Sequence, residues 1–250
     1  MDRFFINKNN INTEQNKCFI EGEDVKHISK VLRCKIGEKI EVCDKDNSEY
    51  ICEITNIDKS IVELDILEKK EIKRESELKV RLYQGLPKGP KMEMILQKLT
   101  EVGVDEIILV QTKRSVSKVD DKKEDKKIER WERIIYEAAK QSKRGKIPSL
   151  RGVISFKEAL EDMKSNDLNI APYENEKTKS IKQVIRNNNI NNIGIFVGPE
   201  GGFEEIEIEA IENIGGQSVS LGPRILRTET ASVVASSIVL YELSDLGGDI

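Results

Sequence analysis

The chain has 250 residues, of which 38% are hydrophobic and 34% are charged, and its formal net charge is −4. These values predict a soluble globular protein with one large domain or two modest ones. The apolar runs are far shorter than a bilayer span, and the N-terminus lacks the apolar segment of a secretory signal, so we expect a cytoplasmic protein without membrane contact. A net acidic chain is not a general nucleic-acid coater, so any contact with RNA must use local basic patches.

The cysteines and the single histidine argue against several kinds of site. The four cysteines, Cys18, Cys34, Cys43 and Cys52, form no CxxC pair, and we expect them to be reduced thiols in a protein core. His27 is the only histidine, so we expect no metal site. His27 also has no nucleophile motif around it, which argues against a hydrolase of the Ser-His-Asp or Cys-His type.

The first 70 residues contain short runs that alternate apolar, often β-branched residues with polar ones, which predicts a small β domain. One helix is predicted among these strands, because Val25, Ile28 and Leu32 recur at helical spacing. The charged run at 68–77 has no apolar period and is predicted to be a linker. A domain boundary is therefore expected there, between residues 72 and 73.

After the linker, strand-like and helix-like segments alternate to the end of the chain. Strands are predicted at 78–84, 106–111, 168–172, 192–197 and 217–221. Helices are predicted at 91–104, 126–142, 155–164, 180–188, 204–214 and 230–244. This alternation predicts an α/β domain, 73–250, whose parallel sheet has helices on both faces and binds ligands at the carboxyl ends of its strands.

Two loops share one design. The segment 197–205 reads VGPEGGFEE and 220–231 reads SLGPRILRTETA, and each follows a predicted strand and begins with Gly-Pro. Glycine permits close approach of a ligand, and proline removes a hydrogen-bond donor. A loop that is short of donors and carries Glu200 should repel phosphate and suit an uncharged or cationic ligand, such as an adenosine or a sulfonium. A tight turn ahead of a helix is the alternative interpretation of the first loop.

The second loop carries the more reactive side chains. Arg224 and Arg227 can grip a phosphate or the carbonyl groups of a base. An ion pair between Arg227 and Glu229 is the alternative interpretation. Thr228 is predicted to cap the N-terminus of the helix that follows.

These two loops resemble the signature loops of the SPOUT methyltransferase superfamily, and most of all those of the bacterial 16S ribosomal RNA (uracil-N3)-methyltransferases. Further segments resemble blocks of the same family in the same order, so the resemblance spans nearly the whole chain. They are HISKVLRCKIGEKIEVCD (27–44), QGLPKGPKMEMILQKLTEVGV (84–104), ERWERIIYEAAKQSKRGKIP (129–148) and NIAPYEN (169–175). One departure is Glu204, where relatives often carry a Ser or Thr as a helix cap.

The resemblance implies a PUA-like RNA-binding β-barrel at 1–72 and a SPOUT methyltransferase domain with a C-terminal trefoil knot at 73–250. It implies S-adenosylmethionine as the cofactor, a homodimer, and methylation of N3 of one uridine in 16S rRNA of the small ribosomal subunit. Two alternatives stay open: a SPOUT enzyme with another target, such as a tRNA ribose, and a non-catalytic RNA-binding protein of the ribosome. A phosphate-binding nucleotide enzyme is disfavoured, because the first loop lacks the Lys-Ser/Thr of a phosphate cradle.

Three sets of site residues follow from the loops and the resemblance. The predicted catalytic residues are Arg224 and Arg227, which would stabilise negative charge on the uracil, and Glu229, which with Glu200 is a candidate proton acceptor. The predicted cofactor residues are Ala171, Pro172, Tyr173, Val197, Gly198, Pro199, Glu200, Gly201, Leu221, Gly222, Ile225, Leu226, Thr230 and Ala231. The predicted RNA contacts are His27, Lys30, Arg33, Lys88, Lys91, Arg114 and Arg144.

Overall fold

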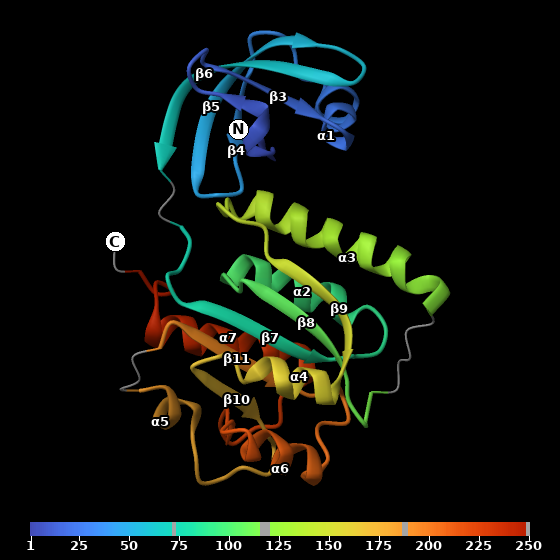
Figure 1. Cartoon of the computed structure of the whole chain (residues 1–250), viewed down its shortest axis with the longest axis vertical. Coiled ribbons are helices and arrows are strands. Elements are labelled where there is room, and N and C mark those ends of the chain that lie inside the picture. The colour runs from blue at the N-terminus through green and yellow to red at the C-terminus, as the bar shows by residue number, and fades with distance from the viewer. Residues whose placement is uncertain (72–73, 116–120, 187–189, 249–250) are drawn as a thin grey trace. The chain divides into compact units, whose positions relative to one another are not determined.

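The computed structural model of the chain describes residues 1–71, 74–115, 121–186 and 190–248 (Figure 1). The chain divides into two compact units, Met1–Glu75 with Ala139–Ile147 and Ser76–Ala138 with Pro148–Ile250. The predicted boundary between residues 72 and 73 lies outside the described residues and stays a prediction. Over the described ranges, no helix is both long and apolar enough to cross a membrane.

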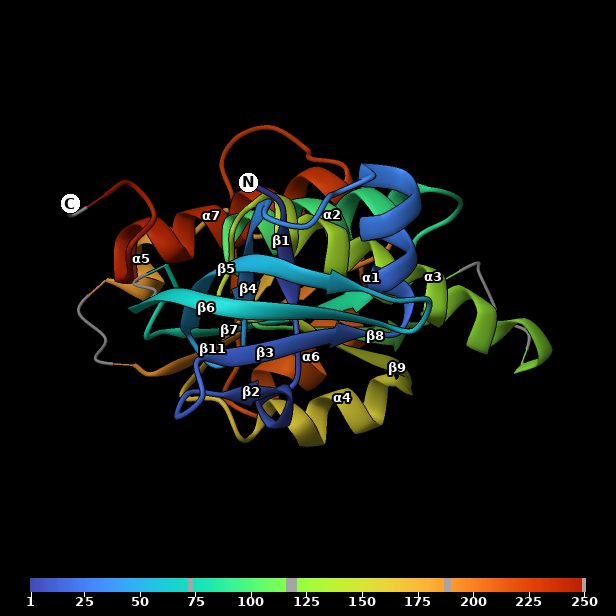
Figure 2. The same ribbon diagram turned by 90° about the horizontal axis from the view of Figure 1, so that it is seen from above.

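The N-terminal unit is built on a curled, mixed six-stranded sheet with the order β1-β4-β5-β6-β3-β2. Only β1 and β4 pair in parallel, and Figure 2 shows β5, β6 and β3 side by side. Its strands are β1 (Arg3–Phe5), β2 (Ile11–Asn12), β3 (Lys17–Glu21), β4 (Lys39–Cys43), β5 (Ser48–Ile57) and β6 (Ile61–Glu71). A single turn η1 (Lys8–Asn10) and the helical segment α1 (Glu23–Lys26) with η2 (His27–Leu32) complete the unit's first part.

The core of this unit confirms the predicted burial of the cysteines and corrects the predicted linker. Cys18, Cys43 and Cys52 are buried free thiols, and Cys34 is half-buried. The prediction of a linker from residue 68 is wrong for its first part, because β6 stays paired with β5 as far as Glu71. The hydrogen bonds of this long hairpin hold charged residues in a strand that their own propensity would not form.

Residues 139–147 join the N-terminal unit through buried ion pairs. The Arg144 side chain is 4% exposed, and its Nη2 lies 2.6 Å from Oε2 of Glu75. The second carboxylate oxygen of Glu75 accepts a hydrogen bond of 2.7 Å from the Gly145 N–H. Arg3, itself buried beside Glu41 and Glu49, donates to the Arg144 carbonyl oxygen over 2.6 Å. Arg144 therefore anchors this segment.

The C-terminal unit contains the predicted parallel sheet, with the order β12-β10-β11-β7-β8-β9. Its strands are β7 (Lys79–Gly85), β8 (Glu106–Gln111), β9 (Ser149–Ser155), β10 (Leu168–Pro172), β11 (Asn192–Val197) and β12 (Gln217–Val219). Its helices are α2 (Lys91–Val102), α3 (Asp121–Gln141), α4 (Phe156–Met163), α5 (Ile181–Ile185), α6 (Glu205–Asn213) and α7 (Thr228–Leu243). The last residues of α3 belong to the N-terminal unit.

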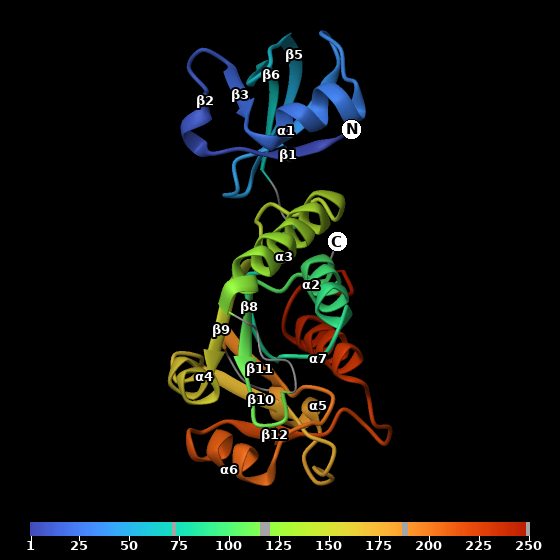
Figure 3. The ribbon, with the colours of Figure 1, turned by 90° about the vertical axis from the view of Figure 1, so that its right-hand side faces the viewer.

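The helices cover both faces of this sheet, as predicted (Figure 3). On one face, Tyr83, Ile108 and Phe196 pack with α4, α6 and Phe203 in one apolar cluster. On the other face, α7 packs against β7, β11 and α2. The side chains of a strand alternate between its two faces, so both must be apolar, which explains why β8 and β11 read as near-continuous apolar runs.

Two elements differ from the sequence-based prediction. The sequence analysis missed strand β9, because SLRGVIS contains a charged residue and a glycine. This strand lies at the edge of the sheet, where it pairs with one neighbouring strand and needs less apolar surface than a central strand. Helix α5 is shorter than the predicted segment 180–188, whose last two residues lie outside the described ranges. At the departure noted above, Glu204 is the N-cap residue of α6, and its N–H donates to Oε2 of Glu207 over 2.9 Å.

A buried polar network joins the end of β7, the loop after β11 and the start of α7. The Thr228 hydroxyl donates to the Gly198 carbonyl oxygen over 2.6 Å and accepts from Nε2 of Gln84 over 3.0 Å. The Ser232 hydroxyl lies 2.5 Å from Oε1 of Gln84. The predicted capping role of Thr228 is wrong, because the N-cap residue is Arg227 and the Thr228 side chain bonds across to the other loop.

We predict that Arg144→Ala destabilises the N-terminal unit by about 3–5 kcal/mol, because it leaves Glu75 as a buried charge without its guanidinium partner. Chemical denaturation measures this loss. Lys146→Ala is the matched control, because this side chain is exposed, and it should leave the transition in place. An unchanged midpoint for Arg144→Ala would contradict the anchoring role.

We predict that Thr228→Val lowers the stability of the C-terminal unit by about 1–3 kcal/mol for each group left unsatisfied, because the Gly198 carbonyl and the Gln84 amide both lose a buried partner. Urea unfolding measures the change. Thr228→Ser keeps the hydroxyl and should retain most of the stability. Thr230→Val removes an exposed hydroxyl from the same helix and should be close to neutral. Equal midpoints for Thr228→Val and Thr230→Val would contradict the role of the network.

Candidate cofactor-binding site

A cavity of about 430 Å³ lies at the carboxyl ends of β10, β11 and β12. Three loops and the start of α7 form its walls, together with one lysine at the start of α2. The lining residues are Lys91, Pro172, Tyr173, Glu174, Val197, Gly198, Pro199, Glu200, Gly202, Phe203, Ser220, Leu221, Gly222, Pro223, Arg224, Ile225, Leu226, Arg227, Thr228 and Ala231. Its volume is within the range of pockets that hold small molecules and cofactors.

Most of the predicted cofactor residues lie in this lining, and both Gly-Pro loops contribute to it. Three do not. Ala171 is fully buried in the sheet, Thr230 is exposed on α7, and Gly201 packs against the side chain of Arg114. The cavity brings the two loops together although β11 and β12 are separated in the sheet by β10. The roles of these residues toward a ligand stay predictions.

The first loop is a tight turn that also forms the cavity wall. The Gly202 N–H donates to the Pro199 carbonyl oxygen over 2.9 Å, and Gly202 has a φ of +66° that favours glycine. A Cβ on Gly85 would lie 2.6 Å from Cδ of Pro199, so the end of β7 must be a glycine for this loop to pack against it. GPEGG is therefore a tight turn that also lines a cavity, and its binding of an uncharged or cationic ligand stays a prediction.

Glu200 links this loop to the loop that follows β7. Its Oε1 accepts hydrogen bonds from the Lys88 N–H over 3.0 Å and from Nζ of Lys91 over 2.9 Å. Partial burial acts to raise the pKa of Glu200, but the hydrogen bonds from Lys91 and from backbone N–H groups outweigh it, and the pKa lies below its ordinary value. Glu200 thus stays ionised and shapes the cavity rim with its carboxylate already bonded to the protein.

Glu229 pairs with the same lysine. Its Oε2 lies 3.9 Å from Nζ of Lys91, and this buried oxygen has no hydrogen-bond donor. The alternative interpretation of an ion pair between Arg227 and Glu229 is wrong, because the cation beside Glu229 is Lys91. Glu229 itself is 9% exposed and lies behind the cavity lining.

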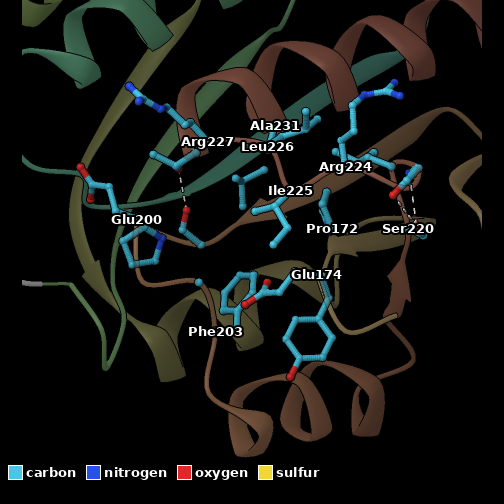
Figure 4. A pocket seen from close by; sticks show the side chains of 18 of the residues that line it. Pro172, Glu174, Glu200, Phe203, Ser220, Arg224, Ile225, Leu226, Arg227 and Ala231 are labelled. Atoms are coloured by element: carbon cyan, nitrogen blue, oxygen red, sulfur yellow. Dashed lines mark hydrogen bonds between the residues drawn. The ribbon is translucent and has the colours of Figure 1, made fainter. Parts of the chain in front are cut away.

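Arg224 and Arg227 line the cavity and are exposed. Figure 4 shows their guanidinium groups turned outward, away from the labelled side chains of the interior. Over the described ranges, no carboxylate forms an ion pair with either arginine. Two unpaired guanidinium groups at the rim can bind the oxygens of a substrate that approaches from outside.

Apolar side chains form part of the cavity wall, beside the charged and polar ones. Phe203 and Val197 are buried in its wall, and Ile225 and Leu226 contribute aliphatic surface. The prolines at 172, 199 and 223 remove backbone donors, so the walls offer carbonyl oxygens and apolar surface in place of a phosphate cradle. Such walls fit the uncharged adenosine and the sulfonium of S-adenosylmethionine. Nowhere in the described ranges do His, Cys, Asp and Glu gather into a group that could hold a metal ion.

The predicted RNA contacts have different surroundings. Lys30 and Arg33 are exposed on the N-terminal unit, whereas the His27 ring is half-buried and packs edge-on against Phe4 at 6.3 Å between centroids. The prediction for Arg144 is corrected: its guanidinium is buried against Glu75 and cannot reach RNA in this conformation.

The remaining predicted RNA contacts belong to the C-terminal unit. Lys88 is exposed, Lys91 bonds Glu200, and Nη1 of Arg114 donates to the Gly201 carbonyl oxygen over 2.8 Å. Lys91 and Arg114 therefore support the first Gly-Pro loop in addition to any contact with RNA.

Sequence reasoning missed several residues of the lining. Gly202, Phe203 and Pro223 belong to the two quoted motifs, so the motifs themselves held the signal. Glu174 directly follows the predicted Tyr173 within the NIAPYEN segment, and it was not selected from that segment. Thr228 was interpreted as a cap, and Lys91 as an RNA contact.

Comparison with known proteins gives consistent matches along the chain. The family model described as an RNA methyltransferase domain matches residues 74–240, and the model described as an RNA methyltransferase PUA domain matches residues 20–67. The ribosomal RNA small subunit methyltransferase E of Bacillus subtilis (strain 168) is 39% identical over 255 residues, which cover 100% of both chains.

Solved structures agree with these matches. A putative methyltransferase from Legionella pneumophila, in complex with the bound cofactor SAM, has a TM-score of 0.87 and 31% identity, and 98% of each chain is covered. A ribosomal RNA small subunit methyltransferase E from Neisseria gonorrhoeae, bound to S-adenosyl methionine, has a TM-score of 0.86 and 30% identity, again over 98% of each chain. With these matches along its whole length, the chain belongs to the ribosomal RNA small subunit methyltransferase E family of RNA methyltransferases.

Proposed function

We propose that this protein uses S-adenosylmethionine to methylate 16S rRNA of the small ribosomal subunit, at N3 of one uridine. The observation that carries the proposal is the cavity formed by two Gly-Pro loops, with two arginines at its rim that have no ion-pair partner over the described ranges. Relatives whose names state a ribosomal RNA small subunit methyltransferase, and structures with the bound cofactor, support it.

The same proposal extends to the architecture. We infer a C-terminal trefoil knot around the cavity, supported by the return of α7 from the sheet-edge strand β12 to pack on β7 and β11. The N-terminal unit would act as the RNA-binding PUA-like barrel, and its match to a PUA domain supports this role. A homodimer acting in the cytoplasm, with domains at 1–72 and 73–250, completes the proposal.

Within the cavity, S-adenosylmethionine would supply an electrophilic methyl group. Backbone groups of Gly198, Leu221, Gly222 and Leu226 would hold its adenosine and methionine parts, and the position of these residues in the cavity lining supports this role. Pro172 and Tyr173, at the end of β10, would close a further side of the pocket. The hydrogen bonds of Thr228 hold the first loop against the start of α7, so that the cavity exists before a ligand binds.

The reacting uracil must lose the N3 proton, and the negative charge then spreads onto O2 and O4. Arg224 and Arg227 would stabilise that charge by donating hydrogen bonds to these oxygens. Glu229 would take the proton through a water that it holds, because its Oε2 is buried behind the cavity lining and has no hydrogen-bond donor. Access to N3 requires an unpaired base, which suits a single-stranded rRNA segment held by salt-dependent contacts from Lys30, Arg33 and Lys88.

We predict that the purified chain binds S-adenosylmethionine in isothermal titration calorimetry and transfers a methyl group to purified small ribosomal subunits. Mass spectrometry of the digested rRNA should locate the new methyl group on N3 of a uridine. A methylated tRNA ribose would favour the other SPOUT target. Absence of cofactor binding would favour a non-catalytic RNA-binding protein and contradict the proposal.

We predict that Arg224→Ala lowers the rate of methyl transfer by about 10²-fold with saturating cofactor, because it removes one donor to the developing oxyanion. Arg224→Lys keeps the charge and should retain more activity. Arg186→Ala is the control, since this exposed arginine pairs with Glu242 and lies outside the cavity lining. Near-normal transfer by Arg224→Ala would contradict the charge-stabilising role.

A further inference from the structure

Glu174 places a carboxylate in the cavity without a partner. The residue lies two positions after the last residue of β10 and belongs to the cavity lining. Figure 4 shows its carboxylate turned toward the middle of the cavity, between Phe203 and Ile225. Over the described ranges, no group donates a hydrogen bond to this carboxylate or forms an ion pair with it. An acceptor of this kind is available to a ligand.

The other acidic residues at the cavity differ from Glu174 in this respect. Glu200 accepts from Lys91 over 2.9 Å, and Glu229 has the same lysine at 3.9 Å. The guanidinium groups of Arg224 and Arg227 are turned outward in Figure 4. The Glu174 carboxylate is therefore the charged group that Figure 4 shows turned toward the middle of the cavity, although Glu174 is exposed to solvent.

Gly202 allows the Glu174 carboxylate to lie in this place. A Cβ at position 202 would be 2.7 Å from Oε1 and 3.2 Å from Oε2 of Glu174, so any larger residue would displace the carboxylate. The second glycine of the GPEGG motif thus has two roles: it adopts a φ of +66°, and it leaves space for an acidic group. A turn alone would require only the first of these.

We propose that Glu174 is a specificity-determining residue that favours the sulfonium-bearing cofactor over the demethylated product. The inference rests on the proposed function. When the methyl group passes from sulfur to N3 of the uracil, the N3 proton goes to a base and the sulfur keeps the electron pair of the broken bond. The sulfur thereby loses its positive charge and becomes a neutral thioether. A nearby carboxylate stabilises the charged state and not the neutral one, so the spent cofactor is released more readily.

The test compares three ligands by isothermal titration calorimetry with the full chain and Glu174→Gln. S-adenosylmethionine and sinefungin carry a positive charge at the reacting position, the latter on an amine, and S-adenosylhomocysteine carries none there. We expect Glu174→Gln to weaken the first two by about 3–10-fold and to leave S-adenosylhomocysteine within about twofold, since the carboxylate is partly exposed to water. Glu174→Asp keeps the charge and should preserve the preference in part.

Glu205→Gln is the matched control, because Glu205 is an exposed acid at the start of α6 that lies outside the cavity lining, and it should change none of the three affinities. Thermal unfolding of each variant separates a binding effect from a folding defect. Equal losses for all three ligands would overturn this inference alone, because Glu174 would then contact a part that they share. Failure of the wild-type chain to bind S-adenosylmethionine would instead overturn the proposed function, and this inference with it.

Discussion

The cavity depends on the hydrogen bond between the Thr228 hydroxyl and the Gly198 carbonyl oxygen. This bond joins the loop after β11 to the first turn of α7, and Gln84 ties both to the end of β7. All of these groups lie out of contact with water, so each lost bond leaves an unsatisfied polar atom in the core. The backbone of the first Gly-Pro loop is thereby fixed in position relative to the second, although the two loops follow strands that are not neighbours in the sheet.

Charge is distributed around the cavity by depth. At the rim, Lys91 lies between Glu200 and Glu229, and the two arginines extend toward solvent. Glu174, although exposed, turns its carboxylate toward the middle of the cavity, and over the described ranges this carboxylate has no hydrogen-bond or ion-pair partner. Positive charge outside suits an anionic polymer with reactive carbonyl groups, and negative charge inside suits a cationic small molecule. Lys91 does not neutralise the Glu174 carboxylate, because its ammonium group already pairs with Glu200 and Glu229.

Sequence patterns predicted most of the elements and most of the cavity lining. The 3.6-residue period identified α2 and α3, and the Gly-Pro pairs identified both loops, because these features are local. Contacts distant in sequence could not be predicted. The bonds from Thr228 to Gly198 and from Arg144 to Glu75 join segments far apart in the chain. The sequence around a single threonine or arginine does not indicate which distant residue it will contact. Strand β9 was missed because edge strands need little apolar pattern, and Glu174 because an acid after a strand is common in loops.

The segment 139–147 has a consequence for how this chain can be divided. Because it belongs to the N-terminal unit but lies within the sequence of the other, the backbone passes between the units at 75/76, 138/139 and 147/148. A fragment cut after Glu75 would therefore lack the Arg144 guanidinium that pairs with the Glu75 carboxylate. Recombination could not exchange the N-terminal unit as one contiguous cassette, so the two units are expected to be inherited together. The two units are linked by three crossings of the backbone and not by a single one.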